Sequence, residues 1–420
     1  MRGLFAFLLE LRAANMPIMR PPISARQLPK TYVPSRHILP GGLLAGMLPL
    51  LALASCVQTT ESTKTMYVNR AQLPDTQFVG PVTALPSSAL AATGSLGRLN
   101  LDGLVVTAWH VASNSGRLIV GGAEHDGTGR VVAVDLATGE VTEVGRLDAA
   151  PSWLTSGHDG VVIAAAAFSD PVAVVGEAIS EDLLDAVPKG PSWDHGRVLA
   201  VDSIHVWAAT GALPIQGKPR TLWTTAHLTR IRLQPPVRVD TLGLLDDTRI
   251  LWSEHGQMMV ALAPTTLLAP FGSGAVIGRT DQSSLLVLDS ALVPQTIIAW
   301  DAPDFELDRD HLTAWHALAE RDEAILGIRS PEYVRRPEKL PHYTRILVES
   351  DSAIWVRTGA LSRGSNVPRL PENSVRWLRV VVGGRAEAFE VPPDWLLIGF
   401  YASRAVILEG DSTIFLAAPD

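Results

Sequence analysis

Short runs of strand-forming residues, separated by turn residues, recur along most of this 420-residue chain. Each run is rich in Val, Ile, Leu and aromatic residues, and Gly, Asp, Asn or Ser lies at its ends. Such runs predict β-strands joined by hairpins. Their repetition over most of the chain favours a β-propeller or a large barrel. The clearest runs are 116–122, 129–147, 159–168, 196–209, 248–262, 274–290, 344–358 and 376–391.

Two tight turns and one helical segment stand out within this pattern. The stretches "DLATGEV" (135–141) and "VVGGRA" (381–386) predict compact hairpins, because each places Gly where a positive φ is easiest. Residues 306–328 space their apolar side chains at helical intervals and predict a helical insertion. The two histidines of that segment, His311 and His316, are five residues apart, so we expect them on a solvated helix face.

The second half of the chain resembles a known family. The stretch 268–303, "LAPFGSGAVIGRTDQSSLLVLDSALVPQTIIAWDAP", is similar to one blade of a six-bladed propeller lipoprotein family of environmental bacteria. "LPHY" (340–343) followed by "TRILVESDSAIWVRT" (344–358) continues the match. The likeness is good over about 265–420 and weaker over 93–264, and Gly383-Gly384 replaces the family's usual Asp-Gly.

The resemblance implies a fold and a membrane anchor, and little chemistry. We expect an all-β, six-bladed β-propeller of the NHL-like or TolB-like kind over residues 93–420, with a short helical insertion near 306–328. A β-sandwich with a helix is the alternative. The eleven Trp residues are spread along the chain, so we expect most of them to pack between sheets rather than to form a sugar-binding platform.

The only cysteine, Cys56, follows the longest apolar run of the chain. Residues 11–60 contain no Asp or Glu, and a basic stretch, an apolar stretch and then Ser55 and Cys56 follow in the order of an export signal. The apolar part, 43–54, is shorter than the roughly 20 residues of a membrane-spanning helix. The tetrad Leu53-Ala54-Ser55-Cys56 resembles the lipobox of bacterial lipoproteins, which implies cleavage between Ser55 and Cys56 and lipid on Cys56. The alternative is a buried cysteine in a core helix.

These features divide the chain into three parts. We expect residues 1–55 to be a lipoprotein signal peptide, although 55 residues exceed the usual length of about 15–30, so we expect translation to start at Met16 or Met19. Residues 56–92 predict a flexible tether, and 93–420 the propeller. Removing 1–55 changes the formal net charge from −8 to −13, because that segment holds six basic residues and one acid.

Charge and anchor together suggest where the protein acts. An acidic body argues against a nucleic-acid partner. Val57, where an Asp tends to retain lipoproteins at the inner membrane, favours the outer membrane, facing the periplasm, so we expect a lipid-anchored monomer at the cell envelope. A single cysteine excludes an intramolecular disulfide and cysteine-rich zinc sites.

Two loop sequences are the candidate functional sites. "SGHDGVV" (156–162) places His158 and Asp159 before a strand, and "WDHGRV" (193–198) places Asp194 and His195 likewise. In propellers such loops can reach the mouth of the central channel. The alternative for both loops is an ordinary β-turn, since Asp-Gly, as in the first loop, favours turns.

Three functions remain open on this sequence. The first is a binding or scaffold module for a protein, peptide or glycan, without catalytic residues. The second is a propeller hydrolase of the calcium-dependent lactonase type, although no ligand set is recognisable and the cofactor is unknown. The third is a structural paralogue that binds nothing. Fold alone does not choose between them.

Overall fold

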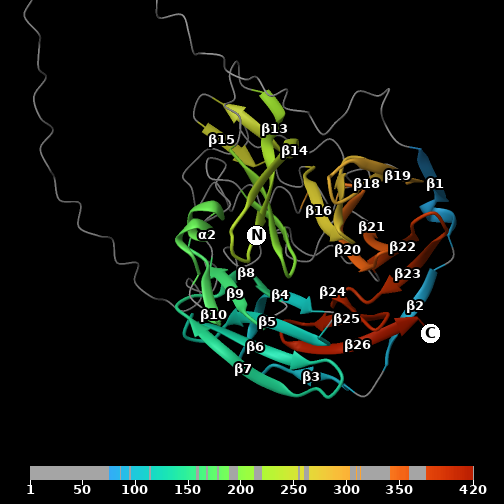
Figure 1. The fold of residues 1–420 in the computed structure, drawn as a ribbon. Coiled ribbons are helices and arrows are strands. Elements are labelled where there is room, and N and C mark those ends of the chain that lie inside the picture. The colour runs from blue at the N-terminus through green and yellow to red at the C-terminus, as the bar shows by residue number, and fades with distance from the viewer. Residues whose placement is uncertain are drawn as a thin grey trace, which may run out of the picture. The chain divides into compact units, whose positions relative to one another are not determined.

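Strands make up nearly all of the computed structural model in the part of the chain that it describes (Figure 1). That part comprises residues 75–85, 87–93, 96–112, 115–157, 160–166, 169–176, 179–188, 197–211, 220–253, 256–259, 264–302, 309, 313, 341–358 and 375–419. All of these residues belong to one compact unit of the chain. The prediction of an all-β fold is confirmed.

Within these residues the strands form six antiparallel meanders in chain order, which we number as sheets 1 to 6. Sheet 1 consists of β4 (Val105–Ala112), β5 (Arg117–Ala123), β6 (Gly129–Asp135) and β7 (Val141–Leu147). Sheet 2 consists of β8 (Pro151–Ser156), β9 (Val162–Ala166) and β10 (Val172–Val175). Sheet 3 consists of β11 (Arg197–Val201), β12 (His205–Thr210), β13 (Arg220–Arg232), β14 (Val239–Ser253) and β15 (Gly256–Met259).

The second half of the chain repeats the arrangement. Sheet 4 consists of β16 (Thr266–Phe271), β17 (Gly274–Arg279), β18 (Ser284–Leu288) and β19 (Pro294–Asp301). Sheet 5 consists of β20 (Tyr343–Ser350), β21 (Ala353–Thr358), β22 (Val375–Val381) and β23 (Ala386–Val391). Sheet 6 consists of β24 (Trp395–Tyr401), β25 (Arg404–Glu409) and β26 (Thr413–Pro419), and the short β3 (Leu99–Asn100) pairs with β26.

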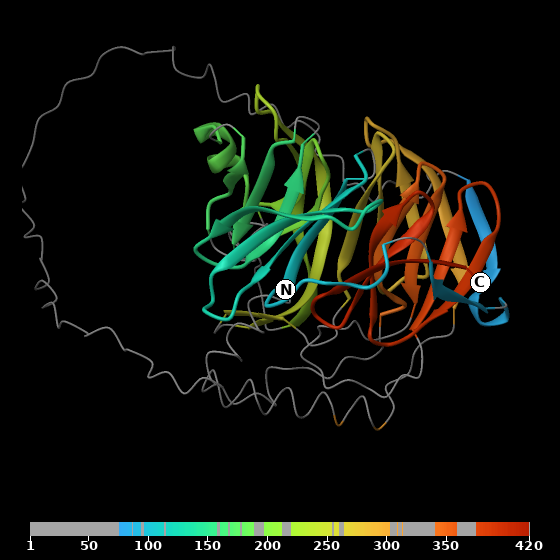
Figure 2. The same cartoon turned by 90° about the horizontal axis from the view of Figure 1, so that it is seen from below.

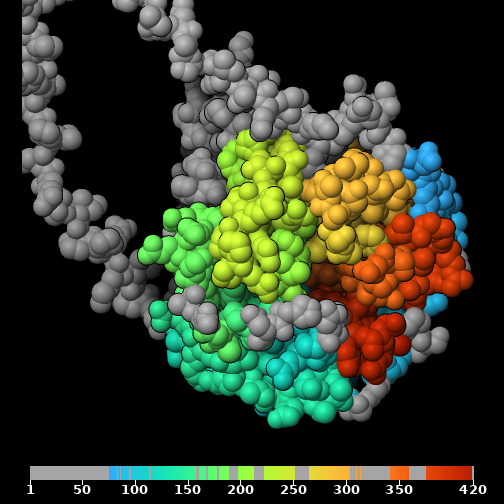
Figure 3. All heavy atoms as spheres, viewed as in Figure 1, coloured from blue at the N-terminus to red at the C-terminus, as the bar shows by residue number. Residues whose placement is uncertain are grey.

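The first strands of the sheets form a closed ring. β4 contacts β8, β8 contacts β11, β11 contacts β16, β16 contacts β20, β20 contacts β24, and β24 contacts β4 again. The sheets therefore follow one another around a common axis, as Figure 1 and Figure 3 show. A closed ring of meandering sheets is the architecture of a β-propeller, which confirms the expected fold class.

The first strands run in one direction around this ring. At their starting ends, Arg197 of β11 reaches the carbonyl of Thr266 on β16. At their finishing ends, the hydroxyl of Thr155 on β8 donates to the carbonyl of Asp202, just after β11, at 2.8 Å. The ring consequently has two distinct faces, one at the starts and one at the ends of the first strands.

The predicted hairpin turns lie where the sequence places them. In "DLATGEV" the Asp135 carboxylate accepts the backbone N–H groups of Ala137 and Thr138, and Gly139 has φ +79°. The turn joins β6 to β7. In "VVGGRA" Gly383 has φ +74° and the turn joins β22 to β23. A residue with a Cβ is strained at a positive φ, so glycine suits both positions.

Close packing between consecutive sheets forms the core. A Cβ added to Gly278 of β17 would lie 2.1 Å from the Tyr343 hydroxyl oxygen, so the glycine lets the first strand of sheet 5 approach sheet 4. Large rings fill the remaining space, as expected for Trp. Four tryptophans are at most 3% exposed, namely Trp207, Trp300, Trp355 and Trp377.

The N-terminal described segment differs from the expected tether. Residues 57–92 predict a flexible arm, but β1 (Thr76–Pro81), the 3-10 turn η2 (Val82–Ala84) and β2 (Ser87–Ala92) are ordered outer strands. β1 pairs in parallel with β19, and β2 pairs in parallel with β23 and then antiparallel with β26 (Figure 2). Their residues resemble a linker in composition, so only the available sheet edges reveal them as strands.

One side chain of this segment contacts the turn between β22 and β23. The Gln77 amide donates to the carbonyls of Val381 and Gly384 at 3.3 and 3.1 Å, and its oxygen accepts the N–H of Gly383 at 2.8 Å. β1 is thus attached to sheet 5 as well as to sheet 4.

The helical content is small among the described residues. The short helix α2 (Glu181–Ala186), capped by the Ser180 side chain, was not predicted. The expected insertion at 306–328 lies outside the described residues apart from Arg309 and Thr313, which are helical. No helix of the described part is long and apolar enough to cross a membrane.

Candidate functional site

The sequence-derived site residues lie outside the described part of the chain. This holds for Ser55 and Cys56, for His158 and Asp159, and for Asp194 and His195. The strands beside the two loops are described: β8 ends at Ser156, and β11 begins at Arg197. These are opposite ends of first strands.

A cation–aromatic pair spans the interior of the ring. The guanidinium carbon of Arg345, on β20, lies 4.9 Å from the ring centroid of Trp109, on β4. β24 separates these two strands in the ring, so the pair reaches across the inner side of sheet 6. Both side chains are partly exposed. An arginine stacked on an indole offers a charge, hydrogen-bond donors and an apolar ring at one place.

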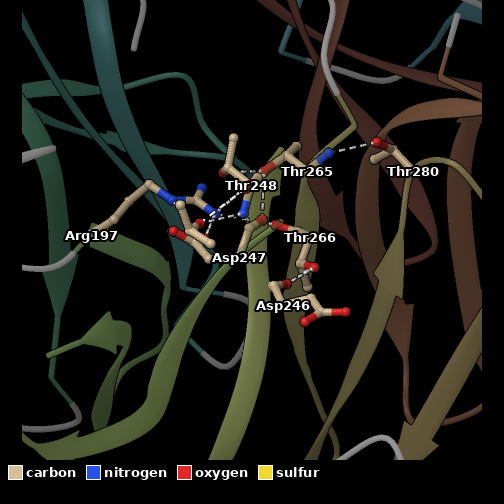
Figure 4. Close-up of polar contacts among 8 residues, drawn as sticks. Arg197, Asp246, Asp247, Thr248, Thr265, Thr266 and Thr280 are labelled. Atoms are coloured by element: carbon tan, nitrogen blue, oxygen red, sulfur yellow. Dashed lines mark hydrogen bonds and ion pairs between the residues drawn. The ribbon is translucent and has the colours of Figure 1, made fainter. Parts of the chain in front are cut away.

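A second arginine forms a buried ion pair at the starting end of the first strands (Figure 4). Arg197 Nε donates to Asp247 Oδ1 at 3.2 Å, and Arg197 Nη2 donates to the same oxygen. The Asp247 side chain is only 7% exposed. Arg197 Nη2 also lies 3.4 Å from the Thr265 hydroxyl and from the Thr266 carbonyl. The pair therefore connects β11 and β14 of sheet 3 with the first strand of sheet 4.

Threonines complete this connection (Figure 4). The hydroxyls of Thr248 and Thr265 are 3.0 Å apart, and the Thr265 N–H donates to the Thr280 hydroxyl at 3.0 Å. The Thr266 hydroxyl donates to the carbonyl of Asp246. The network satisfies its own donors and acceptors within the protein. It is therefore a structural link between sheets rather than a ligand site.

Beside this link lies a more exposed charged cluster. Arg279 contacts the carboxylates of Asp246 at 3.0 Å and of Asp281 at 2.6 Å, and its guanidinium lies 4.3 Å from the centroid of the Trp223 ring. Burial raises the pKa of Asp246, although the Arg279 charge opposes the rise. Both carboxylates are about one-third exposed or less, at 30% and 27%. The cluster connects Arg279 of sheet 4 with Asp246 and Trp223 of sheet 3.

A buried histidine lies on the inner strand of sheet 1. His110 Nε2 is shut off from solvent and has no hydrogen-bond partner among the described residues. Burial lowers the pKa of His110 to about 4, although the nearby Asp202 carboxylate raises it in part. The imidazole is therefore neutral at neutral pH.

The described residues contain no group of three or more His, Cys, Asp or Glu side chains arranged to hold a metal ion. Among the acidic side chains, Glu349 accepts hydrogen bonds from Trp355 and Arg379. Burial raises its pKa, but hydrogen bonds from Arg379 and Trp355 outweigh that effect and lower it overall. The lactonase-type alternative stays a prediction.

Sequence reasoning missed the Arg345–Trp109 pair. The two residues are far apart in the sequence and belong to runs that look alike. Only closure of the ring brings their strands to the same interior. The available signal was weak: an arginine and a tryptophan within strands that also contain other polar residues.

Comparisons with known proteins found distant structural likenesses. A scan of protein families and a search of curated proteins both found no match. Among solved structures the chain is similar to a virginiamycin B lyase from Staphylococcus aureus, at 10% identity and TM-score 0.39, covering 79% of this chain and 100% of that one. A putative 6-phosphogluconolactonase from Bacteroides uniformis has 10% identity and TM-score 0.34, with coverage of 72% and 77%. Sqt1 from Saccharomyces cerevisiae has 10% identity and TM-score 0.33, with coverage of 80% and 100%. The NHL-like or TolB-like label stays a prediction.

Proposed function

We propose that this chain is an exported, lipid-anchored propeller that binds a protein, peptide or glycan at the cell envelope. The six sheets of the described residues support the expected blade count. The signal-like order before Cys56 supports export and anchoring. The acidic body disfavours nucleic acid as the ligand.

The Arg345–Trp109 pair carries the binding half of this proposal. It is the Arg–aromatic contact among the described residues that joins non-neighbouring first strands, so it faces the interior of the ring. Indole faces stack on sugar rings and on peptide side chains, and guanidinium groups bind carboxylates in a bidentate manner. A ligand that enters the ring would meet both groups together.

We expect Trp109→Ala and Arg345→Ala each to weaken ligand binding at least about ten-fold, which is the loss typical of a buried aromatic or arginine anchor. The probes are immobilised panels of short peptides and of neutral and acidic oligosaccharides, applied to the purified protein. Arg98→Ala is the matched control, because Arg98 also stacks on an aromatic ring, Phe415, but at a side chain that is 56% exposed.

The outcome that contradicts the proposal is a ligand set that all three variants bind as the wild type does. A thermal unfolding midpoint for each variant separates lost binding from lost folding. An absence of any ligand on both panels would favour the structural paralogue that binds nothing.

The anchoring half has its own test. We expect the wild-type protein to incorporate a labelled fatty acid and to sediment with membranes, and Cys56→Ser to do neither, because Cys56 is the single thiol. Serine matches the size of cysteine but accepts no thioether-linked lipid. A wild-type protein that retains residues 1–55 and carries no lipid would contradict this half and leave the binding test unaffected.

A further inference from the structure

Sheet 2 has fewer strands than its neighbours in the described part of the chain. It consists of three strands, whereas sheet 1 has four and sheet 3 has five. Sheets 4 and 5 gain a further outer strand from β1 and β2, which pair in parallel with β19 and β23. The molecule therefore already uses strand addition at its outer sheet edges. Among the described residues, β10 is the outer strand of sheet 2 and pairs only with β9.

The side chains of β10 suit a strand that pairs with another segment. Val172 and Val175 are 44% and 41% exposed, which is high for β-branched residues in a strand. Natural edge strands are usually protected by lysines, prolines or bulges. The sequence of β10, "VAVV", contains no charge and no proline, and its one irregularity is a register shift against β9 between Ala173 and Val175. The exposed valines and the uncharged sequence favour pairing with an extended chain, which has to accommodate that shift.

The surroundings of β10 are strongly acidic. Residues 149–188 include sheet 2 and α2, and they contain six Asp or Glu residues and no Lys or Arg. Glu181, Asp182 and Asp185 of α2 are exposed. α2 packs against sheet 2, because Leu183 of α2 and Ile163 of β9 belong to one core cluster. The acidic side chains of α2 therefore lie close to sheet 2.

We propose that the outer edge of β10 binds an extended basic segment of a partner protein by strand addition. Backbone hydrogen bonds to the strand edge supply affinity without a sequence requirement, and alternate side chains supply specificity. Valine side chains of β10 contact apolar residues of the segment, while the acids of sheet 2 and α2 attract its Lys or Arg residues. This surface lies on the outside of the ring, away from the Arg345–Trp109 pair, and it does not depend on the function proposed for that pair.

The probe is a labelled eight-residue peptide of alternating Lys and Val, and the same peptide with Glu in place of Lys is its counterpart. We expect the Lys peptide to bind the purified protein and the Glu peptide to bind at least about ten-fold more weakly, because like charges repel at an interface. Higher salt should weaken binding of the Lys peptide. Hydrogen exchange should show new protection at the amides of 172–175.

Two sets of variants separate the edge from the charge. Val172→Lys with Val175→Lys should weaken binding about ten-fold, since lysine is the residue that natural edges use against pairing. Asp182→Lys with Asp185→Lys should weaken it several-fold without touching β10. The matched control is Val141→Lys on β7, which is 41% exposed like Val175 but lies on a four-stranded sheet.

The proposal is overturned if the β10 double variant binds the Lys peptide as tightly as the wild type does. It is also overturned if the Glu peptide binds equally well, or if protection appears elsewhere and not at 172–175. Trp109→Ala should leave peptide binding unchanged, so failure of this proposal and failure of the proposed ring-interior site are distinguishable.

Discussion

Replacing Asp247 with alanine should lower the free energy of unfolding by about 3 kcal/mol, the cost of leaving one partner of a buried ion pair alone. Arg197 would keep only its two weak contacts at 3.4 Å to Thr265 and Thr266. Its charge would remain largely buried, since the Arg197 side chain is 20% exposed. Chemical denaturation, followed by intrinsic tryptophan fluorescence, measures the loss.

Two further variants show whether the charge or the shape matters. Arg197→Met combined with Asp247→Leu removes both charges and should recover much of the lost stability, because apolar residues of similar size often replace a buried pair without cost. Glu143→Ala breaks an exposed pair with Arg146 and should cost clearly less, because solvent screens exposed charges. If Asp247→Ala costs no more than Glu143→Ala, the link between sheets 3 and 4 contributes nothing.

His110 should make the protein less stable as the pH falls from about 6.5 to about 4. Burial lowers the pKa of His110 to about 4 in the folded chain, whereas the unfolded chain has the ordinary value near 6.5. Between pH 4 and pH 6.5, His110 is protonated in the unfolded chain and neutral in the folded chain. Stability therefore drops with decreasing pH by up to about 3 kcal/mol, and below pH 4 this residue causes no further loss.

The measurement is the free energy of unfolding at several pH values for the wild type and for His110→Gln. The difference between the two curves should shrink or change sign towards low pH, since glutamine does not titrate. His125→Gln replaces an exposed histidine and controls for the substitution itself. Parallel curves for the wild type and His110→Gln would show that His110 is solvated and protonates normally.

The sequence predicts the local hairpins of the fold but not its outer parallel strands. "GRVVAVDLATGEVTEVGRL" (129–147) contains both strands and the turn of one hairpin, because alternation and turn residues are local properties. By contrast, "TQFVGP" (76–81) and "SSALAA" (87–92) have linker-like composition and form strands only because β19 and β23 offer free edges. Edge pairing of this kind is a long-range contact that no local pattern reports.

The site was less predictable than the fold. The loops at 158–159 and 194–195 attract attention as His and Asp pairs, yet the strands beside them adjoin opposite ends of the ring. The Arg345–Trp109 pair carries no local signal, because each residue belongs to an ordinary strand run. Its significance arises only from the position of β4 and β20 on the same interior.

The sequence by itself determined that the chain is a succession of hairpins, since strand period and turn chemistry are written in neighbouring residues. It also determined the order of basic, apolar and small residues before Cys56. Only the tertiary structure decided which strand lies innermost, how Arg197 meets Asp247, and which strand is outermost in sheet 2 among the described residues. Those outcomes depend on closing a ring, and ring closure joins residues hundreds of positions apart, as the contact of β24 with β4 shows.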